Sequence, residues 1–207
     1  MTKIQRELFF SVPFFYIDIE DSKEINRELV RDILKWREED EEGVERSNRH
    51  GWHSTTDMHL KEEFKKITNV INDAQSKLSK VENYHSDWIL QLGSMWANVS
   101  PKYAYNTFHN HLGSLWSGVY YVQCPRDCGS IRFPHTSLWG LPIYNDEQNT
   151  QPHQWTDIKY EPIEGRLILF PGTVGHDVDQ NRTDIEGDDG YRISISFNTI
   201  QVHKGNI

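Results

Sequence analysis

Hydrophobic side chains recur every three or four residues in two segments of the first half of the chain, which predicts two amphipathic helices. The first helix begins after Asp21, with Glu24 as the partner of a capping box, and ends in the acidic run before Gly43. Its apolar positions are Ile25, Leu29, Ile33 and Trp36. The second helix carries one apolar stripe, formed by Phe64, Ile67, Ile71, Ala74, Leu78 and Val81.

From about residue 90 the pattern changes to period two and to short apolar runs, which predicts strands. We expect strands over residues 90–99, 103–111, 117–123, 130–133, 166–170, 176–178 and 192–198, and one or two more within residues 7–20. Many short strands flanked by helices are typical of a β-sandwich or jelly roll. Because no linker separates the halves, we expect one domain over residues 1–207, with mostly helical support in 1–88 and a jelly-roll core in 89–207.

The charge balance narrows the classes of partner. The 207 residues include 31 acidic and 22 basic side chains, a formal charge of −9, whereas nucleic acid and anionic membranes attract positive surfaces. No apolar run approaches the roughly 18 residues of a membrane span, and the N-terminal residues lack the apolar core of a signal peptide. Two cysteines make no disulfide framework. We therefore expect a cytoplasmic protein, and the sequence leaves a homo-oligomer open.

Candidate chemistry begins with the histidines. His109 and His111 stand at i and i+2 of a predicted strand, so both imidazoles would point to one face and reach one metal ion. Alone, such a pair is a weak signal in a chain with 10 histidines. His176 follows an apolar strand and a Pro-Gly turn, and in double-stranded β-helix folds a late strand supplies a third ligand. By itself, His176 fits a partly buried structural histidine at least as well.

Residues 191–198 alternate cleanly between apolar and polar side chains. The polar face holds Arg192, Ser194, Ser196 and Asn198. In a jelly roll this face can line the cavity, and an inward arginine then needs an anionic partner. A substrate carboxylate fits, because the guanidinium is a planar bidentate fork, and Ser194 adds a hydroxyl donor.

Together these residues resemble the iron(II)- and 2-oxoglutarate-dependent oxygenases, in particular a subfamily common in phages and marine bacteria. The resemblance covers most of the chain from about residue 50, through Gly51-Trp52-His53-Ser54, Trp96-Ala97-Asn98-Val99, Ser117-Gly118-Val119-Tyr120-Tyr121-Val122 and residues 192–198. It implies a cupin-like double-stranded β-helix and a dioxygenase that releases succinate and CO2. His109, His111 and His176 would be the metal ligands, and Arg192 and Ser194 would hold the distal carboxylate of 2-oxoglutarate. The implied cofactors are Fe(II), 2-oxoglutarate and O2.

One departure from the family pattern concerns His111, which stands where the typical facial triad has a carboxylate. Three neutral imidazoles leave the metal more positive by one charge and also suit Zn, Ni or Cu. Because a histidine fills the position that halogenases of this superfamily free for a halide, we predict hydroxylation. Whether both His109 and His111 bind the metal stays open at this point.

Four further residues are weaker candidates for lining the site, namely Asn98, Asn106, Ser117 and Tyr121. The primary substrate, a small molecule or a peptide, is not specified by the sequence. The long mixed segment 134–160 is the candidate for substrate specificity.

Two other classes of protein compete with the oxygenase. A metal-binding cupin that does not use 2-oxoglutarate would share the His pair and the late histidine, but it lacks its usual glutamate here and gives no reason for an inward Arg192. A jelly-roll interaction protein without catalysis predicts no metal affinity, although all the candidate ligands are intact. The Cys124 and Cys128 pair has a three-residue gap and no second pair, so we interpret it as a turn.

Overall fold

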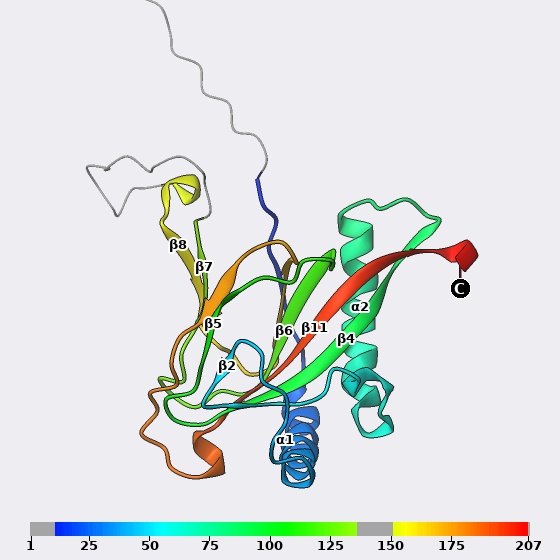
Figure 1. The fold of residues 1–207 in the computed structure, drawn as a ribbon. Coiled ribbons are helices and arrows are strands. Elements are labelled where there is room, and N and C mark those ends of the chain that lie inside the picture. The colour runs from blue at the N-terminus through cyan, green and yellow to red at the C-terminus, as the bar shows by residue number, and fades with distance from the viewer. Residues whose placement is uncertain (1–10, 136–150, 207) are drawn as a thin grey trace, which may run out of the picture.

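Two antiparallel sheets face each other in the computed structural model, which describes residues 11–135 and 151–206 (Figure 1). The six-stranded sheet has the order β1 (Phe15–Asp18), β9 (Arg166–Pro171), β6 (Trp116–Gln123), β11 (Arg192–His203), β4 (Trp88–Ser100) and β3 (Trp52–His53). The five-stranded sheet has the order β2 (Asn48–Arg49), β5 (Tyr105–His109), β10 (His176–Val178), β7 (Ile131–Pro134) and β8 (Asp157–Tyr160). The mainly β jelly-roll prediction is confirmed.

The strands predicted from residue 90 onward all exist, with shifted ends. The largest difference is in β11, which runs on to His203 and pairs with β4 from Arg192 opposite Ser100 to His203 opposite Trp88. A register shift between Asn198 and Thr199 separates the predicted part of β11 from its extension. Since a bulge breaks strict alternation, the period-two pattern ended there although the pairing continues.

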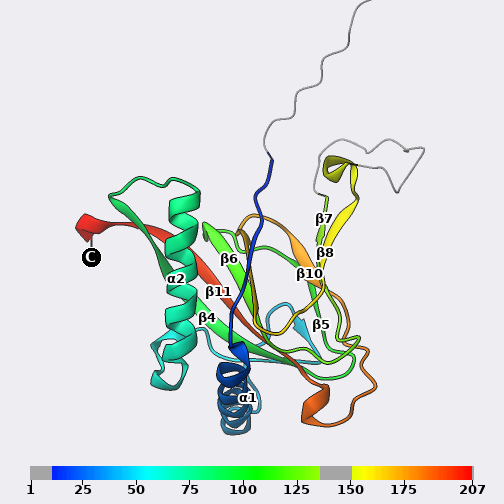
Figure 2. The ribbon, with the colours of Figure 1, turned by 180° about the vertical axis from the view of Figure 1, so that it is seen from behind.

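Two helices cover the outer face of the six-stranded sheet: α1 (Ser22–Glu39) and α2 (Lys65–Val81) (Figure 2). The predicted capping box at Asp21 is wrong, because Asp21 has a left-handed backbone (φ 53°) and its side chain makes no cap hydrogen bond. The helix also ends at Glu39, before the predicted boundary at Gly43. In α2 the apolar stripe is buried except at its last member, Val81, which is 68% exposed in the final turn.

The main hydrophobic core lies between these helices and the sheet. It joins Ile33 of α1, Ile67 of α2 and the outward residues of β11, which are Ile193, Ile195 and Phe197. A smaller cluster between the two sheets includes Val119, Ile131 and Phe170. Apolar side chains thus fill only one part of the space between the two sheets. The rest of that space can form a site.

The N-terminal part of the chain adds strands as well as helical support. β1, β2 and β3 all precede residue 88, and β2 and β3 have two residues each, too few for a periodic signal. β8 lies inside the segment 134–160, the candidate for substrate specificity, for which we predicted no strand, and it pairs with β7. Residues 136–150 of that segment lie outside the described residues.

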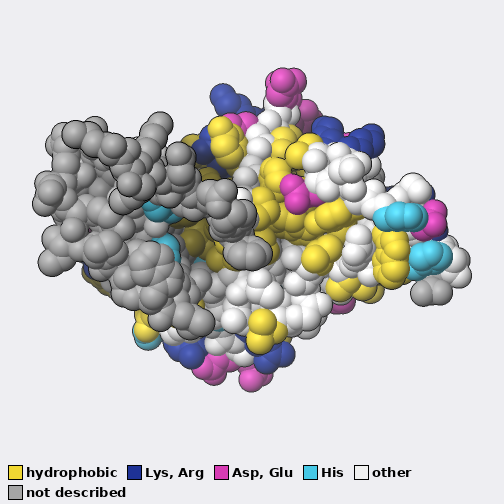
Figure 3. Space-filling model, turned by 90° about the horizontal axis from the view of Figure 1, so that it is seen from above, with side chains coloured by type: hydrophobic (Ala, Val, Ile, Leu, Met, Phe, Trp, Pro, Cys, Tyr) yellow, Lys and Arg dark blue, Asp and Glu magenta, His cyan; other side chains and the backbone are white. Residues whose placement is uncertain are grey.

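The charge distribution on the surface and the hydropathy of the helices can be compared with the partners expected from the sequence. In the view of Figure 3, hydrophobic side chains gather near the centre of the face, and acidic and basic side chains lie mostly around its edge. None of the helices in the described residues is long and apolar enough to cross a membrane.

Candidate active site

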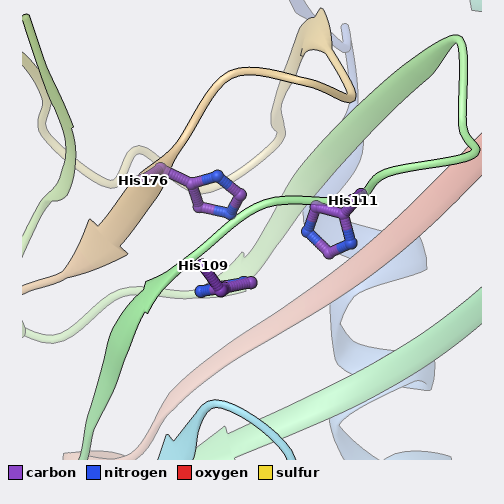
Figure 4. A group of neighbouring side chains, drawn as sticks. All are labelled: His109, His111 and His176. Atoms are coloured by element: carbon purple, nitrogen blue, oxygen red, sulfur yellow. The ribbon is translucent and has the colours of Figure 1, made fainter. Parts of the chain in front are cut away.

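Three histidines from two neighbouring strands and one loop point toward one another (Figure 4). His109 ends β5, His176 begins β10, and the two residues are paired across the sheet. His111 lies beyond the end of β5, so the prediction that it shares a strand face with His109 is wrong. Its backbone N–H donates to the Gly172 carbonyl at 2.8 Å, which ties the loop to the end of β9. The ligand atoms of the three histidines all lie within 4.8 Å of one another.

Backbone carbonyls fix the tautomers of two of these imidazoles. Nδ1 of His109 lies 2.7 Å from the Thr107 carbonyl oxygen, and Nδ1 of His176 lies 3.2 Å from that of Val174. A carbonyl only accepts, so each Nδ1 must carry the hydrogen and each Nε2 keeps its lone pair. This is the arrangement by which proteins orient histidine ligands of metals.

The three imidazoles are also held in their neutral form. Burial, with the neighbouring histidines as a smaller cause, lowers the pKa of His176 to about 3 and that of His111 to about 4. Burial likewise lowers the pKa of His109. A metal binds the neutral imidazole, so these shifts keep the donor set ready for a metal at neutral pH.

His111 is held by aromatic contacts instead of a hydrogen bond to a carbonyl. Its ring centroid lies 5.8 Å from that of Trp96, which in turn stacks on His53 at 5.4 Å. Nδ1 of His53 lies 2.6 Å from the Ser54 carbonyl oxygen. The row of three rings therefore fixes the side chain of the one ligand that does not come from a strand.

The histidines open into a cavity of about 430 Å³ between the two sheets. Arg192, Ser194, Ser196 and Asn198 of β11 all line it, as their alternation predicted. Asn98, Asn106 and Tyr121 line it as well. Ser117 is not among the described lining residues; its hydroxyl donates to Oδ1 of Asn198 at 2.6 Å.

Arg192 is the buried cation of this cavity, with 2% of its surface exposed. Its Nη1 donates to three backbone carbonyls, those of Cys128, Gly129 (3.2 Å) and Asp179 (3.0 Å). Its Nη2 is buried without a hydrogen-bond partner. Burial lowers the pKa of Arg192, because an uncompensated guanidinium is costly in the interior. Hydrogen bonds thus hold the Arg192 side chain through Nη1, whereas Nη2 lacks an acceptor.

Sequence reasoning missed a second group of residues that line the cavity: Arg46, Ser47, His53, Thr56 and Trp96. They come from the segment before β2, from β3 and its flank, and from β4. No periodicity marks them, since β2 and β3 are too short. The only signal was that His53 and Trp96 fall inside the motifs by which the chain resembles a family.

These features define a class of protein: a double-stranded β-helix with three converging histidines that could hold a metal ion and a buried arginine in one cavity. The family model described as "Putative 2OG-Fe(II) oxygenase" matches residues 94–198, just over half of the chain. The chain belongs to this family. It is an Fe(II)- and 2-oxoglutarate-dependent dioxygenase, and its cofactors are Fe(II), 2-oxoglutarate and O2, as predicted.

Solved structures show the same fold at low sequence identity. A prolyl-4-hydroxylase from Pseudomonas putida is 14% identical with a TM-score of 0.62, over 91% of this chain and 92% of that one. The α-ketoglutarate-dependent epimerase SnoN from nogalamycin biosynthesis is 12% identical with a TM-score of 0.64, over 93% and 79%. The viral collagen prolyl hydroxylase of Paramecium Bursaria Chlorella virus-1 is 12% identical with a TM-score of 0.59, over 90% and 94%. A search of curated proteins found no significant match.

Proposed function

We propose that His109, His111 and His176 hold Fe(II), that Arg192 and Ser194 bind the distal carboxylate of 2-oxoglutarate, and that the enzyme hydroxylates a C–H bond of its primary substrate. The donor set fits the metal, because three neutral imidazoles converge with their ligand atoms within 4.8 Å. When bound, Fe(II) supplies the redox chemistry by which O2 converts 2-oxoglutarate to succinate and CO2 and a substrate is hydroxylated.

The single observation that carries the 2-oxoglutarate assignment is the unpartnered Nη2 of Arg192. A buried guanidinium with an unused donor is costly unless a ligand supplies an acceptor. A carboxylate does so with a charge-assisted hydrogen bond. The three carbonyls on Nη1 set the orientation of the side chain beforehand, so the protein holds the anchor in place before the ligand arrives.

Two hydroxyl groups complete the proposed carboxylate site. Ser194 follows Arg192 on the same face of β11 and lines the same cavity. Tyr121 of β6 pairs with Ser194 of β11 and lines the cavity, and burial raises the pKa of its phenol, so the hydroxyl stays protonated and able to donate. Asn98 and Asn106 line the cavity but already donate to Ser196 and Ser47, which favours positioning roles for both.

The experiment is anaerobic reconstitution. The purified protein is loaded with Fe(II), 2-oxoglutarate is titrated in, and binding is followed by the charge-transfer absorption band of the complex. Oxygen is then admitted and succinate is measured. We expect saturable 2-oxoglutarate binding and slow succinate formation without primary substrate. Metal-loaded protein that binds no 2-oxoglutarate would overturn the assignment.

A cupin-type metal protein that does not use 2-oxoglutarate is the alternative for the site. It explains the three histidines, but it leaves Nη2 of Arg192 without an acceptor. Family membership also favours the oxygenase. Metal binding without any 2-oxoglutarate binding in the experiment above would favour the cupin.

We also propose that the chain is one domain and acts in the cytoplasm. The first point is supported by the main hydrophobic core, which joins α1 and α2 to the strands of the six-stranded sheet. The second is supported by Cys124 and Cys128, which are free thiols.

A further inference from the structure

The cavity differs in charge from the rest of the protein. The chain carries 31 acidic and 22 basic side chains, yet the described residues that line the cavity include Arg46 and Arg192 and no aspartate or glutamate. The acidic residue next to a proposed ligand, Asp177, points away and pairs with Arg132 at 2.7 Å. Among the described residues, no carboxylate thus lines the cavity in which we propose that the substrate binds, although the protein as a whole is negatively charged.

Arg46 lies where the cavity meets solvent, since it is exposed and also lines the cavity. Among the described residues, its guanidinium has no carboxylate partner. Its Nη1 makes only a long contact of 3.4 Å with the Glu45 carbonyl, and the Glu45 carboxylate lies 3.7 Å from Arg49. The backbone of Arg46 is fixed, because its N–H donates to Oδ1 of Asn48 at 2.7 Å. The Arg46 guanidinium is therefore a cation without a carboxylate partner among the described residues, and its backbone is held in place.

Ser47, the next residue, also lines the cavity, and its hydroxyl lies beside the proposed metal ligand His109. Its Oγ accepts a hydrogen bond from Nδ2 of Asn106 at 3.1 Å and lies 3.4 Å from Nε2 of His109. When a metal takes the lone pair of that Nε2, the hydroxyl of Ser47 loses this acceptor. Its hydrogen is then available to an acceptor in the cavity.

The geometry points to a small anionic substrate, whose carboxylate or phosphate group binds Arg46 and Ser47 at the mouth of the cavity. This inference rests on the proposed metal and 2-oxoglutarate sites. With Fe(II), Arg192 and doubly negative 2-oxoglutarate in place, the inner part of the cavity keeps one positive charge, because the triad has no carboxylate. Arg46 adds a second positive charge at the mouth. An anion neutralises this excess, and the cation at the rim attracts it.

The size of the cavity is compatible with a small molecule as the bearer of the anion. About 430 Å³ must hold both 2-oxoglutarate and the reacting part of the substrate, in the lower range of small-molecule sites. The lining of the cavity also includes Ser94, Asn98 and Ser196 of β4 and β11. These side chains offer hydrogen bonds to hydroxyl or amide groups, so we expect a polar anion instead of a fatty acid.

The test uses Fe(II)-loaded protein saturated with 2-oxoglutarate under anaerobic conditions. Acetate, inorganic phosphate and uncharged acetamide are titrated separately at constant ionic strength. Binding is followed by the change in the absorption band and by isothermal titration calorimetry. The variants are Arg46→Gln and, as a matched loss of one exposed arginine on α1, Arg31→Gln. Each is first checked for 2-oxoglutarate binding, which depends on the other end of the cavity.

We expect saturable binding of acetate or phosphate, little of acetamide, and about a tenfold or greater loss of anion affinity in Arg46→Gln. Arg31→Gln should bind like the wild type. The anion that binds more tightly tells a carboxylate substrate from a phosphate substrate. Acetamide binding as well as acetate, no saturable anion binding, or unchanged affinity in Arg46→Gln would overturn the inference while 2-oxoglutarate still binds. Failure of the wild type to bind 2-oxoglutarate would instead overturn the proposed function beneath it.

Discussion

Along β11, side chains that point to the helices alternate with side chains that point into the cavity. On the helix side, Ile193, Ile195 and Phe197 are 0% exposed and need only apolar neighbours, which α1 and α2 supply. On the cavity side, Arg192 and Ser194 are also buried, but Nη2 of Arg192 has no partner. Side chains on the two sides are thus similarly buried, but only those on the helix side have all their interactions satisfied by the protein. The helix side is complete within the protein, whereas the cavity side is complete only with a ligand.

This difference predicts that the two sides fail in different ways. Changes on the helix side should lower the free energy of unfolding and leave the ligand affinity of the folded protein intact. Changes on the cavity side should remove binding and leave stability nearly intact.

The largest expected effect is from His176→Ala, on the cavity side. It removes one of the three proposed metal ligands, so Fe(II) binding measured by equilibrium dialysis and succinate formation should both fall to background. The free energy of unfolding of the metal-free protein should stay within about 1–2 kcal/mol of the wild type. His85→Ala, at a side chain 70% exposed, is the control and should change neither. Full Fe(II) affinity in His176→Ala would show that His176 is structural.

Phe197→Ala tests the helix side at a position three residues from Ser194, a proposed ligand contact. Removing a fully buried phenyl ring should cost about 3–5 kcal/mol in the free energy of unfolding, measured by urea denaturation. Ser196→Ala is the matched neighbour that faces the cavity and should cost less than about 1 kcal/mol. If the folded fraction of Phe197→Ala lost its 2-oxoglutarate affinity, the two sides would not be independent.

The alternation on β11 is also what made the fold and the arginine predictable from the sequence. Period two is a local property, so the inward Arg192 and the outward Phe197 followed from their positions alone. His111 was assigned to the correct cluster for the wrong local reason, because the sequence does not show that β5 ends at His109. Arg46 and Ser47 were out of reach, since they enter the cavity only through the long-range pairing of β2 with β5.

Arg192→Lys isolates the geometry of the anchor from its charge. A lysine keeps the positive charge but loses the planar fork, so it cannot both hold the three backbone carbonyls and bind a carboxylate. We expect the Kd for 2-oxoglutarate to rise about 10- to 100-fold, with unchanged Fe(II) affinity. Arg166→Lys, which loses a surface pair with Asp18, is the control and should leave both affinities unchanged. An unchanged Kd in Arg192→Lys would mean that 2-oxoglutarate binds elsewhere.

The last expected effect is a gradual pH dependence that only the cavity side should show. In the folded metal-free protein the pKa of His176 is about 3 and that of His111 about 4, both below the ordinary value of 6.5. Between these values the unfolded chain binds more protons than the folded one, so this stability is present above pH 6.5 and is lost as the pH falls. Each histidine contributes a slope of at most about 1.4 kcal/mol per pH unit. Urea denaturation between pH 7.5 and 5 measures the slope.

Two variants then distinguish the two sides of the sheet by the slope of the free energy of unfolding against pH instead of by its value. Phe197→Ala should lower the free energy of unfolding by the same amount at every pH. The slope against pH should not change, because Phe197 packs among apolar side chains and not against a titrating group. His176→Gln should flatten the curve, because it removes one of the groups that the fold keeps neutral. Equal slopes in His176→Gln and the wild type would contradict the view that the cavity forces its histidines to stay neutral for a metal, and would return His176 to the role of an ordinary buried side chain.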